Sequence, residues 1–468
     1  MFRAAYLSYS AQFHIDAPSS FAYNVAQHIL HVAAAAEQGA GIVVCPEYGI
    51  SGFSNMPKSD WVSGGWYETW ADPGDDAWNV PCTAPDHYPE APSLVSLSCA
   101  AREHSISVVA SIPRLQDGQL YNVALAFTES GRLVSYAKQN LWGESAYIDV
   151  PEGNHPTTFT TDAGVTFGLV VCADLIYKSP VLDLVGSGVK HFVAPVAWDN
   201  SMAQMQVLGW AQGWSGWTGA TLIVSNHRAP NMSGSGVFKG GEVLSSSSSF
   251  YEETDSLHVV DVGGEEGGGA FVVPNVVAIG EEPLPADESW AWKELEEGAV
   301  LESATGAVEC TVRSLGGAAG GYALGVVDGM DADNVHAPSM TWGAKACGVM
   351  ACGAADNSCL DYRAGGGLES LELGFKGLAG DGVVVEVVGY VEGQEDGQVL
   401  MDWRLEDGVL YVEGEEGVRI SSALVYSREF AWDPGAVLPL TKANLTKLAA
   451  AIATGIFTTV VRQSLPNY

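Results

Sequence analysis

Basic residues are scarce in this sequence. Its 468 residues include 21 Lys and Arg against 56 Asp and Glu, which gives a formal net charge of −35. A surface with this excess of negative charge repels nucleic-acid phosphates and anionic lipid headgroups. We therefore expect neither nucleic-acid binding nor attachment to an anionic membrane surface. The charge suits a salty medium, and a solvated acidic surface without a particular role is the alternative.

Long uninterrupted apolar runs are also missing. Residues 4–13 predict a short strand and not the apolar segment of a secretory signal. The longest apolar stretch near the end of the chain, 448–461, contains Thr and Gly and is too short to span a bilayer. Residues 462–468 are polar, which fits a lipid-anchor signal poorly. We expect a soluble chain with no membrane span.

Zinc-type cysteine pairs are absent as well. The eight cysteines include no CxxC pair, and no His stands at matching intervals, so we predict neither a metal nor a cofactor. Four cysteines form a later group that allows two disulfides in three connectivities: Cys310, Cys347, Cys352 and Cys359. Disulfides imply an oxidising compartment. A trimmed or incomplete N-terminus would reconcile that compartment with the missing signal.

What is present, from residue 3 to about 262, is an alternation of helical and strand patterns. Apolar residues recur at helical spacing from Phe21 to Ala36, and an apolar strand pattern follows at 41–45. Residues 121–138 predict a hairpin. Further buried strands are expected at 106–112, 167–174, 191–197 and 221–226. Strands this apolar need cover on both faces, which predicts an α/β architecture of sheets layered with helices.

The pattern changes near residue 263. The segments 263–269 and 281–289 have the composition of linkers, and short apolar runs bounded by Gly and acidic residues follow. A chain of this length also exceeds the usual size of a single core. We assign residues 1–290 to a catalytic α/β domain, 291–436 to a smaller, mostly β domain, and 437–468 to a tail with a helix candidate.

Three ionisable residues stand at the ends of apolar, strand-like runs: Glu47, Lys138 and Cys172. Each alone has an ordinary explanation, since a buried Cys is usually inert and a Glu or Lys at a strand end is usually solvated. Together they form a sufficient set for cleaving an amide. A thiolate attacks the carbonyl, a carboxylate takes and returns the proton, and a cation stabilises the oxyanion.

Three segments carry a resemblance to a known family: PEYGISGF (46–53), YAKQNLWGE (136–144) and GLVVCADLIYKSP (168–180). They resemble the catalytic motifs of the nitrilase superfamily of carbon–nitrogen hydrolases, and more narrowly those of the vanin, or pantetheinase, and biotinidase branch. Other segments resemble the same branch, to about residue 436: 97–112, 193–200, 223–238, 322–329 and 345–359. The resemblance implies a four-layer α-β-β-α sandwich followed by a smaller, mostly β C-terminal domain.

The resemblance also implies roles for the three residues. Glu47 is the expected general base, Lys138 the oxyanion-stabilising cation and Cys172 the nucleophile. The backbone N–H of Ala173, next to the nucleophile, is the expected second oxyanion donor.

Other residues receive less definite roles. Glu144 is the candidate positioning carboxylate, although its segment is one residue shorter than the vanin segment. Asp174 is expected to hydrogen-bond the turn that carries the nucleophile. Trp198 and Asn226 are candidate pocket residues, with core packing as the alternative for each.

The implied function is hydrolysis of a linear amide through a thioester, with pantetheine as the expected substrate and pantothenate and cysteamine as products. Biotinidase activity is the alternative within the branch. A catalytically silent binding relative and acyl transfer to an amine or thiol are alternatives of other classes. The family is largely secreted, which favours an extracellular location over the cytoplasm and a disulfide between Cys82 and Cys99. Cys45 is expected to remain a free core thiol, and the sequence does not predict the oligomeric state.

Overall fold

The alternating pattern of the first 262 residues builds two six-stranded sheets. The computed structural model describes residues 2–14, 16–54, 56–74, 76, 78–200, 206–229, 232–247, 255–263, 272–274, 290–317, 321–332, 341–351, 367–378, 382–391, 398–414 and 418–428. The first sheet has the order β12 (Ser256–Val262), β1 (Phe2–Ser8), β2 (Ile42–Val44), β3 (Ser107–Gln116), β4 (Gln119–Phe127) and β5 (Leu133–Ala137). The second has the order β11 (Glu242–Ser247), β10 (Ser235–Lys239), β9 (Thr221–Ser225), β8 (His191–Pro195), β7 (Thr166–Leu169) and β6 (Thr157–Thr160).

Helices α1 (Ala17–Glu37) and α3 (Pro92–His104) cover the outer face of the first sheet. The side chain of Asp16 caps the N-terminus of α1 by accepting from the Ser19 N–H at 2.8 Å. The buried faces of both helices share one apolar cluster with alternate residues of the strands, such as Val43 and Val108. Three short helices, α2 (Lys58–Ser63), η1 (Pro81–Thr83) and η2 (Pro85–His87), lie in the connection between β2 and α3.

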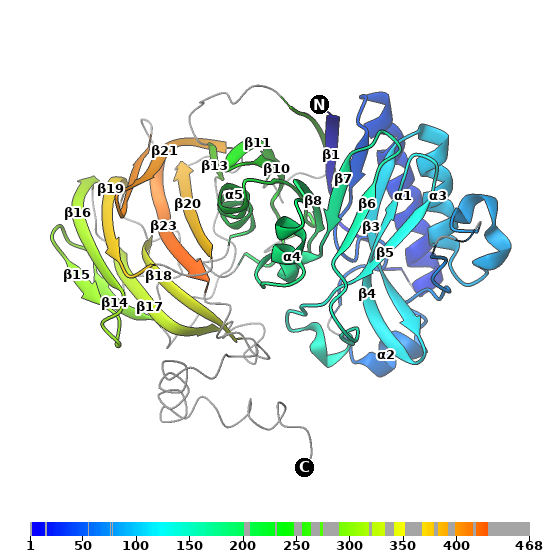
Figure 1. Cartoon of the computed structure of the whole chain (residues 1–468), viewed down its shortest axis with the longest axis horizontal. Helices are drawn as coiled ribbons and strands as arrows, with labels where there is room; N and C mark the ends of the chain where they lie inside the picture. Colours follow the sequence, from blue (N-terminus) through cyan, green and yellow to red (C-terminus); the bar gives the residue numbers. More distant parts are fainter. Residues whose placement is uncertain are drawn as a thin grey trace, which may run out of the picture.

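The inner faces of the two sheets meet in a second apolar cluster. Val44 and Val109 contribute to it from the first sheet, and Leu169 and Val193 from the second. Helices α4 (Val181–Gly186) and α5 (Val207–Thr218) lie against the outer face of the second sheet (Figure 1). The predicted α-β-β-α sandwich is therefore confirmed.

The later part of the chain forms two more sheets. One has the order β13 (Val272–Pro274), β21 (Gln398–Glu406), β22 (Val409–Gly414), β19 (Leu368–Lys376), β16 (Glu309–Gly317) and β15 (Val300–Glu302). The other has the order β14 (Ala291–Glu294), β17 (Tyr322–Ala332), β18 (Thr341–Ala351), β23 (Val418–Arg428) and β20 (Gly382–Val391). Their facing residues form an apolar core of their own, so the predicted mostly β character of this region is confirmed.

Helix α5 lies between the α-β-β-α sandwich and the β region and packs on both. One side of it packs on the second sheet, where Trp214 meets Phe192 edge-on at 5.1 Å between ring centroids. Its other side packs on the β18–β23–β20 sheet, where the rings of Trp210 and Tyr426 are 5.7 Å apart (Figure 1). A helix that is apolar all round is expected to be buried on both sides. The α-β-β-α sandwich and the β region thus pack against each other through α5.

Two locally predicted elements have different outcomes. The hairpin at 121–138 is confirmed, because β4 and β5 pair antiparallel. The strand predicted at 167–174 was wrong at its end, since β7 stops at Leu169 and Cys172–Leu175 forms the 3-10 turn η4. The apolar run continues past Leu169 because the turn itself is buried in the core. The helix candidate in 437–468 and the linker at 281–289 lie outside the described residues.

Four of the six described cysteines form two disulfides, and Cys45 and Cys172 are free. Cys82 is bonded to Cys99 and Cys310 to Cys347, which fits an extracellular protein. Cys45 is a free buried thiol, as predicted. Cys352 and Cys359 lie outside the described residues. Within the described part of the chain, no helix is long and apolar enough to cross a bilayer.

Candidate active site

Glu47 lies in a turn just after β2. Its side chain is 1% exposed and each oxygen has a donor. Oε1 accepts from Asn122 Nδ2 at 2.7 Å, and Oε2 accepts from the backbone N–H of Ala197 at 2.7 Å. The Glu47 carbonyl oxygen lies 2.6 Å from Nε2 of His227. The carboxylate is therefore held in one orientation by groups from both sheets.

Lys138 follows β5 and is shared between two carboxylates. Its Nζ lies 2.9 Å from Oε1 of Glu47 and 2.9 Å from Oε1 of Glu144, and all three side chains are buried. Glu144 opens the 3-10 turn η3 (Glu144–Ala146), and Asn122 Nδ2 reaches its Oε1 at 3.4 Å. The structure thus brings Glu144 to the same ammonium group as Glu47, despite the shorter segment.

Cys172 begins the turn η4 with a φ of 46°, in the left-handed region that residues with a Cβ rarely adopt. Hydrogen bonds to the Asp174 side chain stabilise this strained backbone conformation. Asp174 Oδ2 accepts from the Val171 N–H at 3.0 Å and from the Tyr136 hydroxyl at 2.8 Å. Asp174 Oδ1 accepts from the Asn140 side chain at 2.8 Å. These bonds hold the turn, which agrees with the structural role expected for Asp174.

The protonation of the cluster follows from burial and from its excess of negative charge. Burial raises the pKa of the Cys172 thiol well above its ordinary value, and Glu47 raises it further, while Lys138 and the Ala197 N–H act in the opposite direction. Burial favours a neutral Lys138, but Glu144 and Glu47 hold its pKa well above the usual range. Burial and the charge of Glu47 raise the pKa of Glu144 to about 7, while Lys138 acts in the opposite direction.

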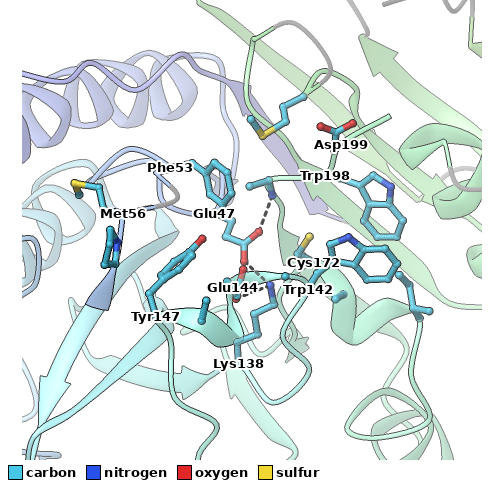
Figure 2. Close-up of a pocket in the computed structure, with 17 residues that line it drawn as sticks. Glu47, Phe53, Met56, Lys138, Trp142, Glu144, Tyr147, Cys172, Trp198 and Asp199 are labelled. Carbon is cyan, nitrogen blue, oxygen red and sulfur yellow. Dashed lines mark hydrogen bonds and ion pairs between the residues drawn. The ribbon is translucent and has the colours of Figure 1, made fainter. Parts of the chain in front are cut away.

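The cluster lies at one wall of a cavity of about 560 Å³. Figure 2 shows Glu47, Lys138 and Glu144 meeting at this wall with Cys172 beside them. Trp142 and Trp198 lie on the Cys172 side, and the opposite side is formed by Phe53, Met56 and Tyr147. A volume of this order fits a small molecule.

Three sequence candidates have different positions around this cavity. Ala173 and Trp198 line it. Asn226 is fully buried and is not among the residues that line it. Its Oδ1 accepts from the Trp198 N–H at 3.1 Å and its Nδ2 donates to the Trp198 carbonyl at 3.1 Å. Asn226 therefore fixes the backbone of Trp198 and does not reach the cavity.

Several residues of the site were not predicted. Asn122 contacts both carboxylates. It is a polar residue inside the apolar run from Leu120 to Phe127, and this pattern could have identified it. Tyr147 and Met56 line the cavity from irregular segments, where no periodic pattern marks them. Among the described residues, no cluster of His, Cys, Asp and Glu has the arrangement of a metal site.

The negative charge of Glu144 gives a first testable prediction. Because Glu144 raises the pKa of the Cys172 thiol, Glu144→Gln should move the pH profile of Cys172 alkylation by iodoacetamide to lower pH. The Glu144→Gln protein and its reference protein both carry Cys45→Ala, because Cys45 is the other free thiol of the described chain. Glu103→Gln, at an exposed position of α3, is the matched control and should leave the profile in place. An unchanged or upward-shifted profile for Glu144→Gln would contradict the electrostatic account.

Residues 9–228 match the family model of the carbon–nitrogen hydrolases. The chain is 33% identical to a biotinidase from Takifugu rubripes over 226 residues, which are 45% of this chain and 44% of that protein. It is 32% identical to a pantetheinase from Bos taurus over 223 residues, 44% of this chain and 42% of that protein. The chain thus matches less than half the length of each of these curated relatives.

A similar structure was found as well. It is a variant of an amidase of the nitrilase superfamily from Nesterenkonia, with 23% sequence identity and a TM-score of 0.43. The match covers 56% of this chain and 90% of that one.

Proposed function

We propose that this chain, whose residues 9–228 match the family model of the carbon–nitrogen hydrolases, is an amidase that cleaves a linear amide through a thioester on Cys172. The observation that carries the proposal is the buried cluster of Glu47, Lys138 and Cys172 at the wall of a cavity of small-molecule size. A thiol, a carboxylate and an ammonium are the groups that acyl transfer from an amide requires.

In the first half of the proposed reaction, Glu47 accepts the proton of the Cys172 thiol as the sulfur attacks the substrate carbonyl. The raised pKa of the thiol means that it is protonated before substrate binds, so a base is needed. The tetrahedral oxyanion accepts hydrogen bonds from Lys138 Nζ and the backbone N–H of Ala173. Glu47 then returns the proton to the nitrogen, the C–N bond breaks, and the amine leaves a thioester behind.

In the second half, Glu47 removes a proton from a water molecule that attacks the thioester carbonyl. The C–S bond breaks, the proton returns to the sulfur, and the product is a carboxylic acid. Glu144 acts as the positioning carboxylate, because it holds the other side of the Lys138 ammonium at 2.9 Å. The acid ionises, and Glu47 and Glu144 then repel its carboxylate from the site.

Pantetheine is the proposed substrate, with pantothenate and cysteamine as products. The similarity to pantetheinases and biotinidases is nearly equal, so biotinyl-lysine is the second candidate. Purified protein should be assayed with both amides at equal concentration, and release of cysteamine and of lysine measured. Cleavage of biotinyl-lysine without release of cysteamine would replace the pantetheinase assignment by the biotinidase one.

Two alternatives from other classes are tested with the same protein. A catalytically silent binding relative would hydrolyse none of the amides. An acyl transferase would pass the acyl group to an added amine or thiol in place of water, which product analysis detects. For an enzyme of the proposed type, we expect hydrolysis with the free acid as the main product.

We also propose that the protein works outside the cytoplasm. The disulfides Cys82–Cys99 and Cys310–Cys347 support this location, because such bonds persist in oxidising compartments.

A further inference from the structure

Tyr147 presents the cavity with a rigidly held aromatic ring. It follows η3 directly, and its backbone N–H donates to the Glu144 carbonyl at 3.0 Å. Its ring is stacked on that of Trp61, with 5.8 Å between centroids and 10° between planes. Trp61 itself is 0% exposed. Stacking on the buried Trp61 ring therefore fixes the position of the Tyr147 phenol.

The hydroxyl of Tyr147 is buried and has no hydrogen-bond partner among the described residues. Burying a hydroxyl without a partner is unfavourable, so such a group in a cavity wall indicates that a ligand supplies the partner. Figure 2 shows this hydroxyl directed toward the Glu47 side of the cavity. Burial, and then the charges of Glu144 and Glu47, raise the pKa of Tyr147 far above its ordinary value. The phenol therefore stays protonated and can donate.

The half of the substrate that meets Tyr147 follows from the proposed chemistry. Glu47 delivers the proton to the leaving nitrogen, so that nitrogen and its substituent lie on the Glu47 side of the scissile carbonyl. Tyr147, Phe53 and Met56 form the cavity wall on that side, away from Cys172 (Figure 2). This wall is apolar and polarisable apart from one hydroxyl, and sulfur is accommodated well by aromatic and thioether side chains.

We infer that Tyr147 is a specificity-determining residue whose hydroxyl donates a hydrogen bond to a polar atom of the leaving amine. The amine class that fits has an uncharged polar end, such as a thiol or a hydroxyl. A leaving group with its own carboxylate fits less well, because it would approach Glu47 and Glu144. This inference rests on the proposed amidase function and concerns the amine half of its substrate.

Three amides with one acyl group test the inference. They are the pantothenic acid amides of 2-aminoethanethiol, 2-aminoethanol and propylamine, which differ only in a terminal SH, OH or CH₃. All three give the same acyl-enzyme, so differences in kcat/KM arise before the shared deacylation step. The wild type should prefer the hydroxyl and thiol amides over the propyl amide. Tyr147→Phe should reduce that preference by about tenfold for the hydroxyl and by less for the thiol, and should leave the propyl amide unchanged.

Tyr48→Phe is the matched control. The Tyr48 hydroxyl is also buried without a partner among the described residues and is also close to Glu144 and Glu47, but Tyr48 does not line the cavity. The preference should therefore persist in Tyr48→Phe. An equal loss for all three amides in Tyr147→Phe would show a merely structural role and overturn the inference. A change of preference in Tyr48→Phe as large as in Tyr147→Phe would overturn it too.

A binding measurement separates this inference from the proposed function. Calorimetric titration of the Cys172→Ala protein with the three amides requires no turnover. The order of the dissociation constants should favour the hydroxyl and thiol amides, and Tyr147→Phe in the same background should abolish that order. If the wild type hydrolyses none of the amides while this order is found, the proposed function fails and the role of Tyr147 in binding stands. Equal dissociation constants for all three amides with Cys172→Ala would overturn the inference itself.

Discussion

The Cys172→Ala protein should have no measurable amidase activity, with kcat reduced by roughly four to six orders of magnitude. Cys172 carries the acyl group in the proposed reaction, and no other thiol lines the described cavity. The alanine methyl fits the space of the thiol, so the fold should be retained. Amine release from the preferred amide, followed at high enzyme concentration, measures the loss.

Cys45→Ala provides the control for this experiment. Cys45 is the other free cysteine of the described chain and lies only two positions before Glu47. It is 0% exposed in the core between α1 and the first sheet, and burial raises the pKa of its thiol. We expect Cys45→Ala to keep most of the activity. Turnover by Cys172→Ala with loss of turnover in Cys45→Ala would contradict the assignment of the nucleophile.

The Lys138→Met protein should lose both activity and stability. Methionine has a similar shape, but it leaves the two buried carboxylates of Glu47 and Glu144 without their shared cation. Breaking a buried ion pair by removing one partner typically costs about 3–5 kcal/mol of the free energy of unfolding. Denaturant titration measures this cost. Amide hydrolysis should fall by roughly two to three orders of magnitude, because a donor to the oxyanion is lost.

A double variant separates the two effects. Lys138→Met/Glu144→Gln removes the second carboxylate together with the cation, so one buried charge remains in place of two. We expect part of the lost stability to return without recovery of activity. If the double variant recovers activity together with stability, Lys138 acts through the fold alone and has no part in the reaction.

The order of the elements in the α-β-β-α sandwich was predictable because its strands and helices have clear periods. The hairpin of β4 and β5 follows from apolar runs on either side of a short polar turn, and the structure pairs them as expected. The burial of α5 on two sides was harder to predict from the sequence. Its tryptophans, such as Trp210 and Trp214, already make a helix that is apolar on every side, which indicates cover on both.

The chemistry of the site was predictable only in part. Resemblance to a family directed attention to Glu47, Lys138 and Cys172, whereas spacing alone did not. The predicted end of β7 lay too far along the chain, because Val170, Val171 and Cys172 continue the apolar pattern of the strand. A left-handed φ at Cys172 depends on the bonds of Asp174 to distant residues, which no local pattern encodes. Tyr147 was missed for a related reason, since its position depends on stacking with Trp61.

The most direct test of the central claim is to trap the acyl-enzyme. Wild-type protein is mixed with pantetheine, quenched in acid within the first turnovers, digested and mapped by mass spectrometry. We predict a mass increase equal to the pantothenoyl group on the peptide that contains Cys172, absent from Cys172→Ala and sensitive to hydroxylamine as a thioester is. The same experiment with biotinyl-lysine should give the biotinyl adduct on Cys172 if the biotinidase assignment is correct. Hydrolysis of either amide with no acyl group on Cys172, or with the group on another residue, would contradict the account.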